Sequence, residues 1–197
     1  MAAALRKYGF RPIMELRSNG NTKEVPAMPP PPHVALAIDA VKYYLENGEP
    51  PPGPAPLPEE LKRRGGAFVS IKKNGKLRGC IGTVTPAEPS LAREIIRNAI
   101  SAATRDPRFP PVSPEELADL TFSVDVLTPP EKVSGVAGLD AGTYGVILKS
   151  GDKQAVLLPD LEGIDTVEAQ IDICRKKAGV GENDPVELLR FRVERFN

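Results

Sequence analysis

Two short apolar segments joined by Asn74-Gly75 constrain the fold of this chain more than any other feature. Asn-Gly readily adopts the positive φ angles of a two-residue turn, so the pattern predicts an antiparallel hairpin over residues 65–84. A turn of that length places Val69 opposite Cys80. Apolar residues occur on both faces of the predicted hairpin. We therefore expect it to lie inside a sheet that is covered on both faces.

Apolar periodicity predicts the remaining elements. Apolar residues at steps of three and four predict helices over 33–47, 89–104 and 167–178, and a capping box at Ser113 predicts a short helix. Alternating residues predict strands at four further places: 120–126, 144–148, 154–158 and 186–196. Hairpins separated by helices predict an α+β fold of two layers, in which helices flank a mostly antiparallel sheet.

Proline divides the chain into an extension and a body. Eleven of the 22 prolines fall between Pro26 and Pro58. Residues 1–32 show no periodicity, so we interpret them as an N-terminal extension, followed by one domain over residues 33–197. We expect Pro50–Pro58 to be a stiff connector outside any central strand, because proline lacks the donor that a strand needs.

Composition argues against several classes of function. The 26 basic and 26 acidic residues cancel, and the chain has no Trp, which argues against nucleic acid as a partner. We find no membrane span and no secretory signal, and two cysteines do not form a disulfide framework, so we expect a cytoplasmic protein. A single histidine excludes a His-rich zinc site, and we predict neither a metal nor a cofactor.

The run from Arg78 to Gly82 is the densest chemical signal. Arg78 and Cys80 are two apart on a predicted strand and so share a face, where the guanidinium would lower the pKa of the thiol. Gly79 and Gly82 would let a ligand approach the backbone. The alternative is that Cys80 is a small buried hydrophobe, and its predicted position opposite Val69 favours this alternative.

A rigid polar turn follows the helix predicted over 89–104. Within it, Asp106 could act as a base and Arg108 could bind a carboxylate or phosphate. The alternative is that Asp106 caps the turn and Arg108 forms a surface ion pair. We expect His33 to have a surface or capping role and Cys174 to lie in the core.

Leu77-Arg78-Gly79-Cys80-Ile81-Gly82 resembles the signature of the AMMECR domain family, also called AmmeMemoRadiSam system protein A. Further segments resemble the family in the same order. They are Gly66-Ala-Phe-Val-Ser-Ile71, Asp106-Pro-Arg-Phe-Pro-Pro111, Val126-Leu-Thr-Pro-Pro-Glu131, Leu157-Leu-Pro159 and Lys177-Ala-Gly179. The resemblance runs from Val34 to the C-terminus.

The resemblance implies two unequal subdomains with a cleft between them and the signature strand near that cleft. It also implies a Memo-type protein and a radical SAM protein as partners in a shared modification pathway. It supplies no reaction.

Two hypotheses of function follow. In the first, the chain is an enzyme of a macromolecule-modification pathway, with catalytic Cys80 and Asp106. Its substrate-binding residues would be the following four: Arg78, Gly79, Gly82 and Arg108. In the second, the chain is a non-catalytic binding or scaffold module for partner proteins or a small ligand. Nucleic-acid recognition through the basic residues of the hairpin is a weaker third hypothesis.

Overall fold

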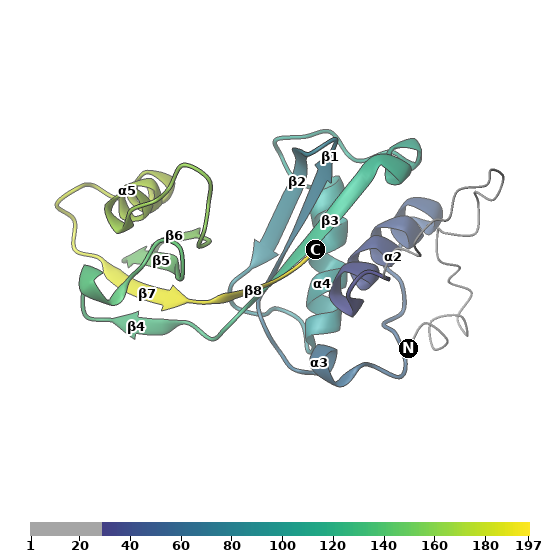
Figure 1. The fold of residues 1–197 in the computed structure, drawn as a ribbon, viewed down its shortest axis with the longest axis horizontal. Coiled ribbons are helices and arrows are strands. Elements are labelled where there is room, and N and C mark those ends of the chain that lie inside the picture. Colours follow the sequence, from purple (N-terminus) through teal and green to yellow (C-terminus); the bar gives the residue numbers. More distant parts are fainter. Residues whose placement is uncertain (1–28) are drawn as a thin grey trace, which may run out of the picture.

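The computed structural model describes residues 29–197, which form helices and two antiparallel sheets (Figure 1). The α-helices are α2 (Pro32–Asn47), α3 (Glu59–Lys62), α4 (Leu91–Thr104) and α5 (Val167–Ala178), and two 3-10 helices are η3 (Pro114–Asp119) and η4 (Val136–Gly138). The strands are β1 (Ala67–Lys73), β2 (Lys76–Thr83), β3 (Leu120–Leu127), β4 (Glu131–Val133), β5 (Gly145–Ser150), β6 (Lys153–Leu157), β7 (Glu187–Phe191) and β8 (Val193–Phe196). The predicted α+β class is confirmed. The extension predicted over 1–32 lies outside the described residues except for its last four.

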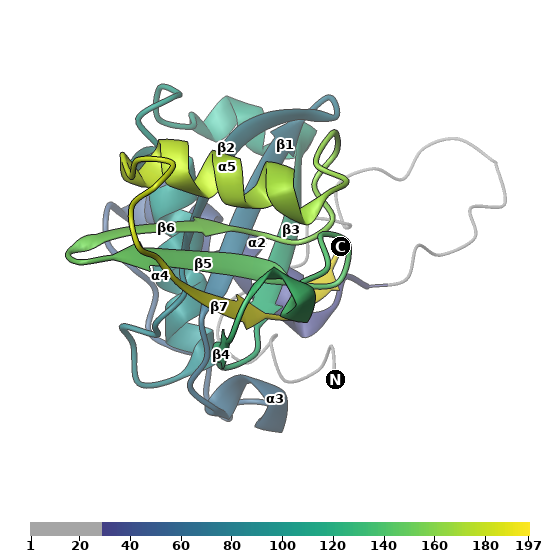
Figure 2. The same ribbon diagram turned by 90° about the vertical axis from the view of Figure 1, so that its left-hand side faces the viewer.

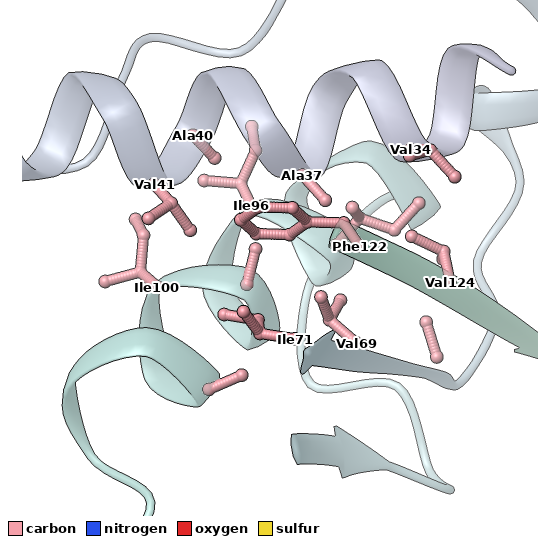
Figure 3. Close-up of a cluster of buried hydrophobic side chains, with 14 of the residues drawn as sticks. Val34, Ala37, Ala40, Val41, Val69, Ile71, Ile96, Ile100, Phe122 and Val124 are labelled. Atoms are coloured by element: carbon pink, nitrogen blue, oxygen red, sulfur yellow. The ribbon is translucent and has the colours of Figure 1, made fainter. Parts of the chain in front are cut away.

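The first sheet has the strand order β2-β1-β3-β8 and carries α2 and α4 on one face, here called the helix face. Its core is aliphatic, and Figure 3 shows side chains of α2 and α4 meeting those of β1 and β3. Alternation along β1 buries Val69 and Ile71 completely. Buried alanines such as Ala99 and Ala102 let α4 pack closely on the sheet.

The second sheet has the strand order β4-β7-β5-β6, and α5 covers one face of it. Val146 and Leu148 of β5 point toward α5, where they pack with Cys174, which is fully buried as expected. In Figure 2, β5, β6 and β7 pass in front of the first sheet and run across its strands. The molecule therefore has two unequal lobes, the first built on the first sheet with α2 and α4, and the second on the second sheet with α5.

A third apolar cluster joins the lobes. Its buried members are Leu127, Ile147 and Phe191, from one strand of the first sheet and two of the second. Two backbone connections cross beside it, and the Thr128 amide donates to the carbonyl of Arg192 at 3.0 Å. The single strand predicted over 186–196 is wrong, because Arg192 divides it into β7 and β8, which lie in different sheets.

The hairpin forms around Asn74-Gly75, but its predicted pairing fails beyond the first two pairs. Lys72 pairs with Leu77 as a two-residue turn requires, and a β-bulge then shifts the register by one residue. Cys80 therefore pairs with Ser70, and the predicted pairing with Val69 is wrong. β2 is also an edge strand, so only β1 of the hairpin lies inside the sheet.

The predicted helices are confirmed, and so is the capping box. Gly48 and Gly179 take left-handed φ angles at the ends of α2 and α5, and Ser113 and Glu116 form the capping box of η3. The expectation for His33 is wrong, because the residue is only 5% exposed and its ring stacks on that of Phe196 at 3.8 Å between centroids. Within residues 29–197 no helix has the length and apolar character to cross a membrane.

Candidate functional site

The β-bulge decides which face of the first sheet carries the Cys80 thiol. Because Cys80 pairs with Ser70, its side chain points away from the helix face toward the opposite face, here called the far face. The Ser70 hydroxyl donates to Sγ of Cys80 at 3.2 Å. Ser123 of β3 continues the same row, since it pairs with Ser70 on the other side. These three side chains form a half-buried row of small polar groups.

The surroundings of Cys80 favour the protonated thiol. Burial raises the pKa of Cys80 and is the largest influence on it. The hydrogen bond from Ser70 and the charge of Arg108 lower the pKa, whereas the carboxylates of Asp125 and Asp106 raise it, and the net shift is upward. The guanidinium that acts on the thiol is therefore that of Arg108, where the sequence predicted Arg78.

Asp106 and Arg108 hold the outer edge of β2. One Asp106 oxygen accepts from the Cys80 amide at 2.8 Å, and both oxygens accept from the guanidinium of Arg108 at 2.9 and 2.7 Å. The backbone amide of Arg108 donates to the same carboxylate at 3.1 Å. The hydrogen bonds from the Arg108 side chain are the main reason that the pKa of Asp106 lies far below its usual range, and those from the backbone amides of Cys80 and Arg108 add to the effect. A buried carboxylate with four donors is suited to positioning β2 and is a poor proton acceptor.

Arg78 points to the loop before β3 and binds groups of the protein itself. Its guanidinium donates to both oxygens of Glu116, at 3.1 and 2.9 Å, and to the carbonyls of Pro110 and Pro111. Lys73 adds a second ion pair to Glu116 at 3.1 Å. The hydrogen bond from Arg78 is the main reason that the pKa of Glu116 falls to about 2. Arg78 thus ties the bulge of β2 to the segment that leads into β3.

Gly79 and Gly82 allow close packing on opposite faces of β2. A Cβ atom on Gly79 would lie 2.1 Å from the carbonyl oxygen of Ala102, so only glycine lets β2 approach α4 this closely. A Cβ atom on Gly82 would lie 2.1 Å from the ring of Phe68, which covers Gly82 on the far face. Both glycines therefore have a packing role within the fold.

A second arginine–carboxylate pair lies on the far face. Asp125 of β3 is buried, and it accepts from Nε of Arg195 at 2.8 Å and from Nη2 at 3.1 Å. Sequence reasoning missed this pair, together with Ser70 and Glu116. The capping box did contain Glu116, but nothing local indicated that Arg78 would be its partner. No local sequence pattern marks Ser70 or Asp125 as a site residue. They come near Cys80 only because β1 pairs with both β2 and β3.

The structure thus brings Cys80, Asp106 and Arg108 together and directs Arg78 elsewhere. The catalytic and substrate-binding roles assigned to them stay predictions. Among residues 29–197, no group of three His, Cys, Asp or Glu side chains is placed to hold a metal ion. A shallow groove of about 330 Å³ lies between the ends of β4 and β7, and none of the predicted site residues lines it. The predicted cleft beside the signature strand also stays a prediction.

Comparisons with known proteins agree with this architecture. The AMMECR1 family profile matches residues 34–196. A protein of Thermotoga maritima is 52% identical over 168 residues, which cover 84% of this chain and 97% of that protein. A protein of Clostridium acetobutylicum is 45% identical, and its match covers 83% of this chain but only 35% of that longer protein. The crystal structure of an uncharacterised protein from Pyrococcus horikoshii matches with a TM-score of 0.76 at 34% identity, covering 83% of this chain and 88% of the other.

Proposed function

The chain belongs to the AMMECR1 family, and from that membership and the geometry of its signature strand we propose that it is a non-catalytic binding module for partner proteins. The observation that carries this proposal is the state of Cys80. Burial raises the pKa of its thiol, and the one nearby carboxylate predicted as a base, Asp106, already accepts four hydrogen bonds. A protonated thiol without a free base is poorly suited to nucleophilic catalysis.

The other signature residues support the same reading. Arg78 is engaged by Glu116 and two carbonyls, and the two glycines serve close packing. The signature residues therefore hold the edge strand β2 in a fixed position on the first sheet. A brace of this kind suits a module that must keep a fixed shape for a partner.

The partners that we propose are a Memo-type protein and a radical SAM protein, the two that the family resemblance implies. In the Clostridium relative, the matched region makes up 35% of a longer chain. The alternative is that the module binds a small ligand in place of a partner protein.

We place the protein in the cytoplasm. Cys80 and Cys174 are both free, as a reducing compartment would keep them. No helix of the described residues suits a membrane span, which is consistent with this placement.

The test is the pH dependence of Cys80 alkylation by iodoacetamide in the folded protein, read by mass spectrometry. Cys174 is the internal control, since it is fully buried and burial raises its pKa to about 11. We expect Cys80 to react slowly at neutral pH, with an apparent pKa above the free-thiol value of about 8.5.

Rapid reaction with an apparent pKa below that value would overturn the proposal and support the thiol enzyme. A matched variant, Ser70→Ala, separates the two influences on the thiol. Removing the Ser70 hydrogen bond should raise the apparent pKa of Cys80 further, because that bond lowers it.

A further inference from the structure

The far face of the first sheet carries a small exposed shelf beside Cys80. We define the shelf by six residues: Ser70, Lys72, Leu77, Cys80, Arg108 and Ser123. Register places Lys72 beside Leu77 and Ser70 beside Cys80 on this face, and Arg108 contacts the Cys80 carbonyl at the β2 edge. Leu77 is 41% exposed and is one of two large apolar side chains that are exposed among the described residues.

The polar groups of the shelf are hydrogen-bond donors and cations. Lys72 is exposed and has no partner among residues 29–197. Arg108 is 55% exposed, and its Nε and Nη2 are bound to Asp106 while Nη1 has no partner within the same part of the chain. The bidentate pair fixes the plane of the guanidinium and leaves its outer edge toward solvent.

Among residues 29–197, the two carboxylates that act on the Cys80 thiol, those of Asp106 and Asp125, are both engaged by arginines. Asp106 is buried, and its oxygens are fully used by the Cys80 amide and by Arg108. The acidic residues of η3 belong to the helix side of the sheet, where η3 contacts α2. Asp125 is buried, and both of its carboxylate oxygens accept hydrogen bonds from Arg195. A shelf with cations, spare donors and an exposed leucine complements an acidic segment that also carries an apolar side chain.

We propose that this shelf binds an acidic, leucine-like segment of a protein partner, with Lys72 and Arg108 receiving its carboxylates and Leu77 receiving its apolar side chain. The inference rests on the proposed function and names the surface and the partner chemistry that the proposed function leaves open. The positive charges of Lys72 and Arg108 favour an acidic segment over a basic one. The shelf spans only a few residues of β1 and β2, a length that suits a short extended peptide.

The charge of the shelf can be measured with two alkylating reagents of similar size. Iodoacetate is an anion and iodoacetamide is neutral, so the ratio of their rates at Cys80 reports the local potential and cancels the thiolate fraction. We expect this ratio to exceed that of N-acetylcysteine by about three-fold at low salt and to fall as salt is added. Lys72→Gln and Arg108→Gln should each reduce it toward the reference.

Lys76→Gln is the matched control. Lys76 lies on β2 in the same hairpin and pairs with Lys73, whose side chain reaches Glu116, so the same change of charge falls on the helix face. This control should leave the ratio unchanged. Because Lys72 has no partner within the described chain, Lys72→Gln tests the shelf even where Arg108→Gln weakens the β2 edge.

Binding is tested by protection of Cys80 from iodoacetamide. The probe is acetyl-Glu-Glu-Leu-Glu-Glu-Leu-amide, compared with its Lys-for-Glu counterpart, inorganic phosphate and oligothymidylate. Protection by the acidic peptide alone, lost in Lys72→Gln and kept in Lys76→Gln, would support the proposal.

An unaltered reagent ratio, or equal protection by phosphate or oligothymidylate, would overturn it. A high thiol pKa together with either of these outcomes would leave the binding module standing and remove only this surface. A low thiol pKa would instead remove the proposed function itself.

Discussion

Asp106 shows how one buried side chain can replace a neighbouring strand. β2 is an edge strand, and the amide of Cys80 on its outer side would otherwise face solvent or another chain. The Asp106 carboxylate takes that amide, and Arg108 binds the carboxylate in turn. A charged group therefore closes the edge at the position of Cys80, and it does so from a turn 26 residues further along the chain.

Asp106→Asn tests this role. The Asn side chain has one acceptor oxygen for the four donors that bind Asp106. We therefore expect the variant to lose about 2 kcal/mol of unfolding free energy at pH 7. Urea unfolding measures the loss, and Asp119→Asn, at an exposed position of η3, is the control.

The pH dependence has a defined sign. Because the pKa of Asp106 is lowered in the folded state, its contribution is complete above the unfolded pKa of about 3.9 and declines as the pH falls below it. The wild type and the Asn variant should therefore converge in acid. A constant difference across that range would contradict the assignment.

Asp39 of α2 has the opposite property. Burial raises its pKa to about 6, although Lys42 lowers it. Its protonated form is favoured by folding, so the stability that it contributes is present below pH 3.8 and is lost as the pH rises through 6. We expect Asp39→Asn to stabilise the protein by about 1 kcal/mol at pH 7.5, after allowance for its partial exposure, and to have no effect near pH 3.5.

Thermal unfolding at the two pH values checks this expectation. Glu49→Gln, an exposed carboxylate just beyond the same helix, is the comparison. If Asp39→Asn were destabilising at pH 7.5, the carboxylate would have to make a favourable interaction that outweighs its burial.

At the scale of elements, the bulge in β2 is the decisive irregularity. Regular pairing would place Arg78 opposite Ile71, on the face that α4 covers, and an unpaired guanidinium there would be costly to bury. The bulge puts Gly79 in that position, against the carbonyl of Ala102, and leaves Arg78 free to reach Glu116. The same shift turns Cys80 toward the far face.

Gly79→Ala should expose this constraint. The added Cβ atom would meet the backbone of α4, which does not move as readily as a side chain, so we expect a loss of about 3 kcal/mol. Gly75→Ala is a matched control in the same hairpin, because its Cβ atom would meet nothing within 4 Å and only its φ of 76° is strained. We expect that control to lose about 1 kcal/mol in chemical denaturation. Equal losses for the two variants would argue against close packing of β2 on α4.

At the scale of the whole molecule, the two lobes share one small core. Phe191 is 1% exposed, and its ring covers Gly145 on the neighbouring strand, where a Cβ atom would lie only 2.3 Å away. It packs with Leu127 of the first sheet and Ile147 of the second. The relative position of the sheets therefore depends on a few apolar side chains and on the paired connections at Thr128 and Arg192.

Phe191→Ala should uncouple the lobes. We expect a loss of about 4 kcal/mol, and amide hydrogen exchange that becomes faster over residues 131–191 than in the first sheet. Val146→Ala, at a buried position of the cluster under α5, is the control that weakens the second lobe without touching the junction. Uniform acceleration of both lobes in Phe191→Ala would indicate a single cooperative unit.

Much of the local structure follows from the sequence alone. Apolar periodicity located α2, α4 and α5, and Asn74-Gly75 located the first hairpin, because these signals depend on neighbours within a few residues. The capping box depends on local backbone conformation and was predicted for the same reason. The signature itself was sufficient to indicate the family, since its residues stand in one continuous segment.

Tertiary structure decided the rest. The break at Arg192, the burial of His33 against Phe196 and the register of Cys80 each depend on segments far apart in the chain. The close approach of β2 to α4 leaves room only for a glycine, Gly79, at the point of contact. The bulge in β2 places Gly79 there, and no local sequence pattern indicates this bulge. The sequence by itself determined which residues form the signature strand. Only the packing of that strand against α4 decided which way its thiol points, because a glycine must face α4 and the bulge then turns Cys80 to the far face.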